Sequence, residues 1–157
     1  MTSGDVAQAE RALERLFRLS VSRSMHARQS AAVGARVTRA GYALLRSLHE
    51  QGALTMAELA RECAMDPAAA ARQVQALEHD RLVRREVGEH DARTNVVHLT
   101  DDGRAVYRRM VNVRTRYLEQ VLASWPRADR AALADLVDRL VTDLQSVPYR
   151  PRPEKTS

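Results

Sequence analysis

The sequence contains a single cysteine, Cys63, so it has no partner for an internal disulfide. One thiol also gives no support to a zinc site built on cysteines. Proteins that mature in oxidising compartments commonly carry disulfides, and nothing in the cysteine content points to such a compartment. A cytoplasmic location is therefore expected.

Aromatic residues and long apolar runs are also scarce. Aromatic side chains make up only 4% of the chain, which leaves the core to Leu, Val and Ala and favours helices. No apolar run approaches the roughly 20 residues that a membrane span needs. The N-terminal segment 1–10 is polar and acidic, unlike a signal peptide, so we expect an unprocessed chain away from the membrane.

Charge and length limit the possibilities further. Twenty-five Lys and Arg residues against 20 Asp and Glu give a net charge of +5, a modest excess that suits a polyanionic partner. Hydrophobic residues form 45% of the 157-residue chain, enough for one compact domain with a core.

The first third of the chain contains two helical patterns. From Asp5 to about Met25, apolar residues recur at three- and four-residue steps, which predicts an amphipathic helix. Segment 26–37 has no clear period, and we expect an irregular or weakly helical connection there. Thr38 can cap a second helix, which Gly52 would end.

Two start signals follow in close succession. Thr55 and Glu58 match a capping box, and the short helix after them offers Ala57, Leu59, Ala60 and Cys63 for packing. Asp66 followed by Pro67 predicts another helix, extending to about His79. Its apolar face carries Ala70, Val74 and Leu77, whereas its other side carries Arg72, Gln73 and Gln75.

Alternating segments 82–87 and 95–99 then predict a β-hairpin with a polar tip at 88–94. A hairpin directly after two closely joined helices indicates a winged helix-turn-helix. The expected fold is mainly α with a small β-hairpin wing (α+β), in a single domain over 1–146 with a DNA-binding lobe at about 38–104.

The C-terminal part is helical in pattern. Thr100 to Gly103 can cap a long helix, Pro126 can open a last one, and the proline-rich tail 147–157 is expected to be disordered. The apolar stripes at 5–25 and 103–146 are wider than one small lobe needs. We therefore expect these segments to form the interface of a homodimer.

The helix from Pro67 has the pattern of an element that enters the DNA major groove. Arg can pair with guanine and Gln with adenine, but the many alanines indicate few direct base contacts and more dependence on DNA shape. At the hairpin tip, Arg93 could reach a minor groove, braced by Asp91. The alternatives are an ordinary alanine-rich helix and a solvated loop. The expected DNA contacts are Thr55, Pro67, Ala68, Ala69, Arg72, Gln73, Gln75, Asp91 and Arg93.

Three segments together resemble the MarR (multiple antibiotic resistance regulator) family. They are 38–52 (TRAGYALLRSLHEQG), 54–85 (LTMAELARECAMDPAAAARQVQALEHDRLVRR) and 91–104 (DARTNVVHLTDDGR). The resemblance covers roughly 5–146. Two positions depart from the family pattern: Arg81 stands where Gly is usual, so the turn there lacks glycine's freedom at positive φ. Ala92 replaces the first Arg of the wing, which suggests a weaker wing contact.

The resemblance implies a dimeric regulator of transcription that binds double-stranded operator DNA. Members of the family respond to small aromatic or lipophilic effectors or to cysteine oxidation. Cys63 is expected on the inner side of its helix, where a thiol is ordinarily inert. By position, the family's effector site would involve His26, Tyr42, Leu45, Tyr107 and Met110, although Leu45 and Met110 fit a core role equally well.

Other functional classes have less support in the sequence. There is no phosphate-binding Gly-rich loop and no recognisable catalytic constellation, so we expect no enzyme activity and no cofactor. No two of the five histidines have i, i+4 spacing, so no metal site is expected. The remaining alternatives are a winged-helix protein-interaction module and a nonspecific DNA-binding protein.

Overall fold

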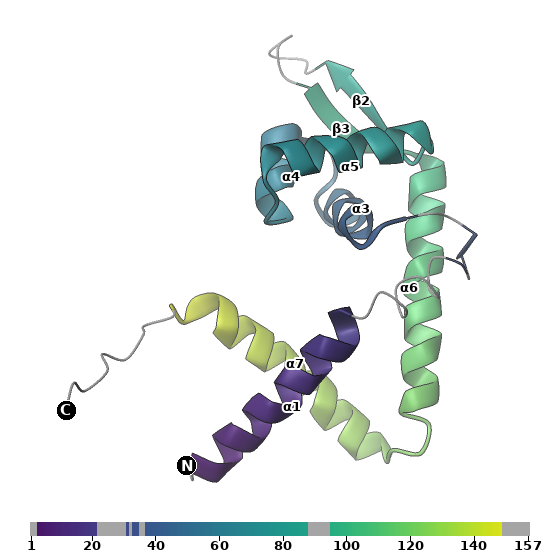
Figure 1. The fold of residues 1–157 in the computed structure, drawn as a ribbon. Helices are drawn as coiled ribbons and strands as arrows, with labels where there is room; N and C mark the ends of the chain where they lie inside the picture. Colours follow the sequence, from purple (N-terminus) through teal and green to yellow (C-terminus); the bar gives the residue numbers. More distant parts are fainter. Residues whose placement is uncertain (1–2, 22–30, 32, 35–36, 88–94, 149–157) are drawn as a thin grey trace, which may run out of the picture. The chain divides into compact units, whose positions relative to one another are not determined.

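The computed structural model describes residues 3–21, 31, 33–34, 37–87 and 95–148. Its elements are α1 (Ser3–Val21), α3 (Arg39–Gln51), β1 (Leu54–Thr55), α4 (Met56–Glu62), α5 (Pro67–His79), β2 (Val83–Val87), β3 (Asn95–Leu99), α6 (Asp101–Val121) and α7 (Arg127–Ser146) (Figure 1). The predicted fold class, mainly helical with a small hairpin, is confirmed.

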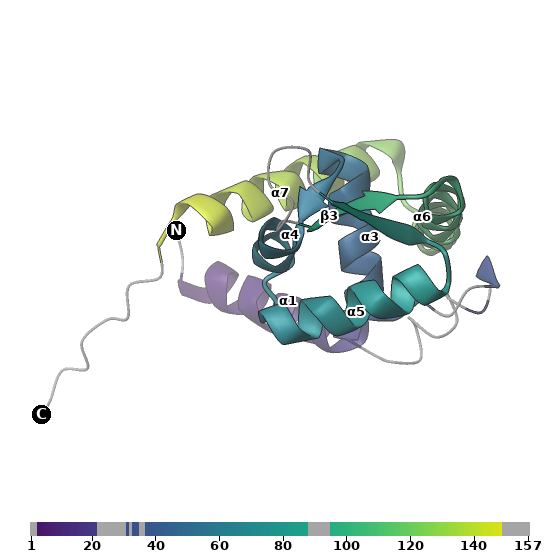
Figure 2. The ribbon, with the colours of Figure 1, turned by 90° about the horizontal axis from the view of Figure 1, so that it is seen from above.

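The chain divides into two compact units, Met1–Thr115 and Arg116–Ser157, with the boundary inside α6. Within the first unit, α3, α4, α5 and the β2–β3 hairpin form one lobe, and α6 lies on the side of the lobe away from α4 (Figure 2). Most of segment 26–37, whose conformation the sequence left open, and most of the tail, 149–157, lie outside the described residues. No helix in the described part of the chain is long and apolar enough to cross a membrane.

The predicted helix starts are present. The Thr38 hydroxyl accepts a hydrogen bond from the Gly41 amide at 2.9 Å, and Gly52 ends α3 with φ of +85°. Thr55 and Glu58 form the complete capping box of α4. At α5, the Asp66 carboxylate accepts from the Ala69 amide at 2.9 Å, ahead of Pro67 in the first turn. These caps satisfy backbone donors that a helix start leaves free.

Both helices of the helix-turn-helix end in the same way, with a residue in the left-handed conformation. Ala64 after α4 has φ of +49°, and Arg81 after α5 has φ of +59°. The Met65 and Leu82 amides donate back to the Ala60 and Leu77 carbonyls, at 2.9 Å and 2.8 Å, which is the Schellman arrangement. Arg81 therefore adopts the positive φ that glycine reaches more easily, despite its side chain.

The sheet has three antiparallel strands in the order β1-β3-β2. The hairpin of β2 and β3 pairs Val83 with Leu99 and Val87 with Asn95, as the alternating pattern predicts. The third strand, β1, is only two residues long and was not predicted. It pairs Leu54 with Val97, and this pairing fastens the start of α4 to the wing.

The lobe has one continuous apolar core. Helix α5 contributes Ala70, Val74 and Leu77, all buried, which confirms its predicted inner face. In α4, Leu59 and Ala60 are buried and Cys63 is partly buried, but the prediction that Ala57 packs inward is wrong because Ala57 is exposed. The main buried side chains are Leu44, Leu45, Leu48, Leu59, Val74, Leu77, Val83, Val97, Leu99, Val106 and Met110.

Gly103, in the first turn of α6, lies directly against the backbone of the turn after α5. A Cβ built on Gly103 would overlap the Leu82 carbonyl oxygen and lie 2.8 Å from Leu99 Cδ1. The same carbonyl accepts hydrogen bonds from the Thr100 amide and hydroxyl, at 3.1 Å and 2.9 Å. The Thr100 hydroxyl also accepts from the Gly103 amide at 3.0 Å, so Thr100 both caps α6 and fixes the turn that leads from α5 into the wing.

The C-terminal unit has a different surface. Helix α7 begins after Pro126, as predicted, and contains no buried residue. The apolar stripe predicted for it is largely exposed, with Leu136 at 63% and Leu144 at 65% exposure.

Candidate DNA interface

Helix α5 has a continuous exposed face opposite its buried one. At about 3.6 residues per turn, Ala68, Arg72 and Gln75 fall on one side, away from Val74 and Leu77. All the residues of this face are exposed: Ala68, Ala71, Arg72, Gln75, Ala76 and His79. The face is narrow, mostly small side chains, and carries one permanent cation.

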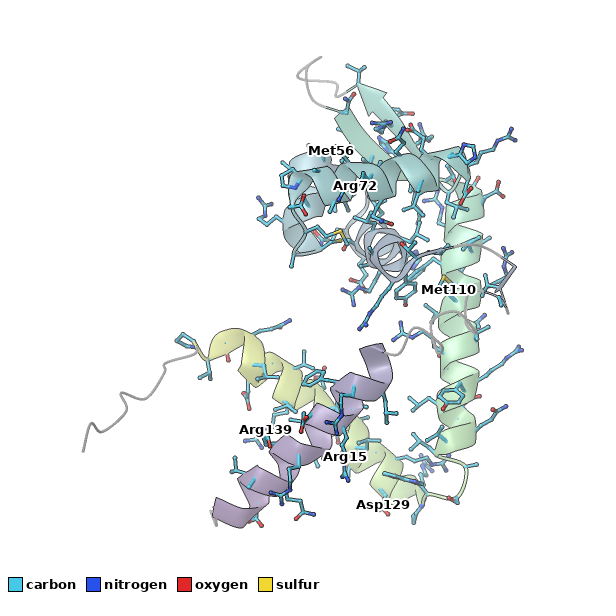
Figure 3. All side chains as sticks on the ribbon, in the orientation of Figure 1. Arg15, Met56, Arg72, Met110, Asp129 and Arg139 are labelled. Carbon is cyan, nitrogen blue, oxygen red and sulfur yellow. The ribbon has the colours of Figure 1, made fainter. Side chains whose placement is uncertain are left out.

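That cation, Arg72, extends from the middle of α5 (Figure 3). The structure gives Arg72 no ion pair within the described residues, whereas Arg85, Arg84 and Arg104 each contact a carboxylate. Its five donors are therefore available to an external acceptor.

Gln73 lies elsewhere, on the flank of α5 that meets α3. The Thr38 hydroxyl donates to the Gln73 side-chain oxygen at 2.6 Å. Gln73 is half-buried, while Gln75, two residues later, is exposed. The two glutamines, which the sequence placed together among the DNA contacts, thus have different surroundings.

Three further predicted contacts lie at the starts of α4 and α5. The Thr55 hydroxyl donates to the Glu58 carboxylate at 2.8 Å and accepts from the Glu58 amide at 3.2 Å, so the capping box occupies it. The Thr55 amide also donates to the Glu58 carboxylate, at 2.8 Å, and this bond, with that from the hydroxyl, holds the pKa of Glu58 below its usual value. Pro67 is exposed and Ala69 half-buried at the start of α5.

The wing is attached to the end of α5 by an ion pair. The Arg85 guanidinium on β2 contacts the Glu78 carboxylate, with Nε at 3.0 Å. The hydrogen bond from Arg85 lowers the pKa of Glu78. Asp91 and Arg93, the predicted minor-groove contacts at the tip, lie outside the described residues.

Aromatic residues of the predicted effector site meet between α3 and α6. The rings of Tyr42 and Tyr107 stack with centroids 5.7 Å apart, and the His49 ring lies 4.5 Å from that of Tyr107. Arg114 donates to the Tyr42 hydroxyl at 2.7 Å. Burial, with smaller contributions from Tyr42 and Glu50, raises the pKa of Tyr107.

The other members of that predicted set do not share one environment. Leu45 and Met110 are fully buried in the core, with Met110 on the side of α6 that faces α3 (Figure 3). His26 lies outside the described residues. Cys63 is partly buried, with its sulfur 3.4 Å from the Ser47 hydroxyl. Among the described residues, no group of His, Cys, Asp and Glu is placed to hold a metal ion.

Comparison with known proteins identifies this arrangement. The family model for MarR matches residues 37–94, from the residue before the α3 cap to the residue before β3. The HTH-type transcriptional regulator YxaD of Bacillus subtilis is 28% identical over 120 residues, covering 76% of this chain and 84% of YxaD. The MarR model thus matches the winged-helix part of the chain.

Solved structures agree with a MarR fold. A MarR family protein from Bacillus stearothermophilus superposes with a TM-score of 0.78 at 21% identity, over 92% of this chain and 99% of that one. BpsR of Bordetella bronchiseptica gives a TM-score of 0.56 at 22% identity, over 88% and 99% of the two chains. At these identities, the two structures show that the chain has the fold of MarR proteins.

Sequence reasoning missed three members of the exposed α5 face: Ala71, Ala76 and His79. A helical wheel drawn from Pro67 would have found them, because they fall on the same side as Arg72. It also separates Gln73 from Gln75, but the partner of Gln73, 35 residues earlier in the chain, has no local signal.

Proposed function

We propose that this regulator binds a roughly palindromic operator as a homodimer, with one α5 in each of two successive major grooves. The observation that carries the proposal is the exposed face of α5, which is mostly alanine and carries Arg72, a cation with no ion pair within the described residues. Small side chains let a helix approach base edges closely in a groove about 12 Å wide. Two-fold symmetry would place the half-sites about 34 Å apart.

The wing supplies the second contact of the proposal. Because the Glu78–Arg85 pair links β2 to the end of α5, the hairpin and α5 would meet DNA as one unit. Arg93 at the tip would enter the flanking minor groove, with Asp91 bracing it. These two roles rest on the sequence.

Exposed apolar side chains support the dimer. Helix α1 exposes Leu16 and Phe17 at 57% and 59%, and α7 exposes Leu136 and Leu144. Apolar surface of this extent marks an interaction site on a protein in water. We assign segments 5–25 and 103–146 to the interface between two copies of this chain.

The proposed regulation is release from DNA by a small aromatic effector. DNA binding by the similar protein BpsR is regulated by 6-hydroxynicotinic acid. In this chain Tyr42, Tyr107 and Arg114 offer stacking surfaces and a cation of matching chemistry. An effector would have to favour a dimer whose two α5 helices are wrongly spaced, which requires different affinities for the two conformations.

The test is binding of the purified protein to DNA from around its own gene, compared with random DNA of equal length, over a salt series. The expected result is saturable binding by a dimer, at least about a thousandfold tighter to the specific DNA. The affinity should fall with rising salt as phosphate counterions are released. Arg93→Ala should weaken it.

Two other outcomes would identify different functions. Equal, salt-sensitive binding to both DNAs at every concentration would indicate a nonspecific DNA-binding protein. Absence of salt-sensitive binding to either DNA, and to a genomic fragment library, would indicate a protein-interaction module.

A further inference from the structure

We infer that Arg72 and Gln75 are the base-reading side chains of α5, and that Gln73 is a positioning residue that holds α5 against α3. The inference rests on the proposed DNA binding and adds which side chains recognise the bases. Each half-site should contain a G·C pair read by Arg72 and, within two base pairs, an A·T pair read by Gln75.

The side chains of Arg72 and Gln75 are free to make such contacts. Both are exposed on the same face of α5, and neither has a hydrogen bond or ion pair within the described residues. Three residues of helix rise about 4.5 Å, close to the roughly 3.4 Å step between base pairs. The two side chains therefore reach neighbouring base pairs.

The chemistry of each side chain selects its base pair. The Arg72 fork matches the O6 and N7 acceptors of guanine, and the Gln75 amide matches N6 and N7 of adenine. Ala68 and Ala71 are exposed beside them and have no polar atoms beyond the backbone. Their methyl groups suit contact with thymine methyls.

The Gln73 side chain makes a hydrogen bond within the protein. Its side-chain oxygen accepts from the Thr38 hydroxyl, which also accepts from the Gly41 amide at the start of α3. One hydroxyl thus joins the first turn of α3 to the middle of α5. Loss of this hydrogen bond should weaken the packing of α5 against α3 and so lower the affinity for every DNA site, while the base preference stays unchanged.

The experiment selects binding sites from a pool of randomised duplexes with the full-length protein and matched glutamine variants. Gln73→Met and Gln75→Met remove the same amide two residues apart while keeping side-chain length. We expect Gln75→Met to lose about tenfold discrimination at one A·T position per half-site, and Arg72→Ala about tenfold at one G·C position. Gln73→Met should keep the wild-type base preferences and bind all sites more weakly by a similar factor.

Thr38 variants and melting curves separate positioning from unfolding. Thr38→Ser keeps the hydroxyl and should match the wild type in affinity and base preference. Melting temperatures measured alongside show whether a weaker variant is still folded at the assay temperature.

Two results would overturn the inference. If the wild type selects a site but Gln73→Met loses preference at one base position, Gln73 reads DNA and the inference is wrong while the proposed function stands. If the wild type enriches no sequence from the pool, the proposed operator binding fails, and the inference fails with it.

Discussion

The replacement of Gly103 by Ala is the sharpest test of how the lobe is held together. Gly103 packs against the backbone of the turn between α5 and β2, where an added Cβ would overlap the Leu82 carbonyl oxygen. Backbone atoms cannot rotate away as a flexible side chain does. Relief therefore requires movement of α6 or of the turn that carries the wing.

The magnitude follows from three contributions. Overpacking costs about 1–3 kcal/mol, and the two Thr100 hydrogen bonds to the Leu82 carbonyl are worth about 0.5–1.5 kcal/mol each if they break. Alanine is preferred over glycine in a helix by about 1 kcal/mol, which offsets part of the loss. Gly103→Ala should therefore lower the free energy of unfolding by roughly 3 kcal/mol, a large part of a typical 5–15 kcal/mol.

The assay is chemical denaturation of wild type and variant at the same protein concentration, followed by helical circular dichroism. Gly4→Ala is the matched control, because a Cβ at Gly4 in α1 meets nothing within 4 Å. It should be neutral or slightly stabilising. If Gly103→Ala stays within about 1 kcal/mol of the wild type with an unchanged denaturant dependence, the proposed packing of α6 on this turn is wrong.

Three further substitutions test other parts of the lobe. Arg81→Gly and Ala64→Gly should each raise the stability of the folded protein by up to about 1 kcal/mol, measured by thermal unfolding. Glycine adopts the positive φ without strain, although it also increases the conformational entropy of the unfolded chain. Lower stability in both variants would contradict backbone strain at these two positions. At pH values above 4.5, the usual pKa of Glu, Glu78→Gln should lower the free energy of unfolding by at most about 1 kcal/mol. The pKa of Glu78 is lowered in the folded state, so the ionised carboxylate adds stability in this pH range, and that stability is lost as the pH falls. Its deficit should shrink in denaturation at lower pH, and a deficit independent of pH would refute a role for the carboxylate charge. Leu45→Ala should cost about 2–5 kcal/mol as a core residue, and a smaller loss would favour a place in an open effector site.

Local signals accounted for most of the fold. Asp66 with Pro67, and Thr55 with Glu58, start helices through atoms within three residues, so the sequence alone located them. The β2–β3 hairpin could also be predicted, because apolar and polar residues alternate regularly along both strands. The two-residue strand β1 was not, because so short a segment has no period and its pairing partner is over 40 residues away.

The candidate site was predictable in its elements and less so in its residues. Of the three residues predicted for the polar side of α5, Arg72 and Gln75 are exposed, whereas Gln73 is half-buried. A helical wheel separates Gln73 from Gln75, but the contact of Gln73 with Thr38 could not be foreseen, because Thr38 reaches α5 only through the packing of α3. The left-handed residues Ala64 and Arg81, which end α4 and α5, could not be predicted because neither is a glycine.

The most direct test of the account is the ratio of affinities for specific and random DNA in two arginine variants. Arg72→Ala removes the cation of the α5 face, and Arg46→Ala removes an exposed cation from α3, outside the segments assigned to the dimer interface. Both change the net charge equally. The account predicts that Arg72→Ala lowers the ratio at least about tenfold and Arg46→Ala leaves it unchanged. An equal fall in both variants, or a ratio unchanged by Arg72→Ala, would contradict recognition of DNA by α5.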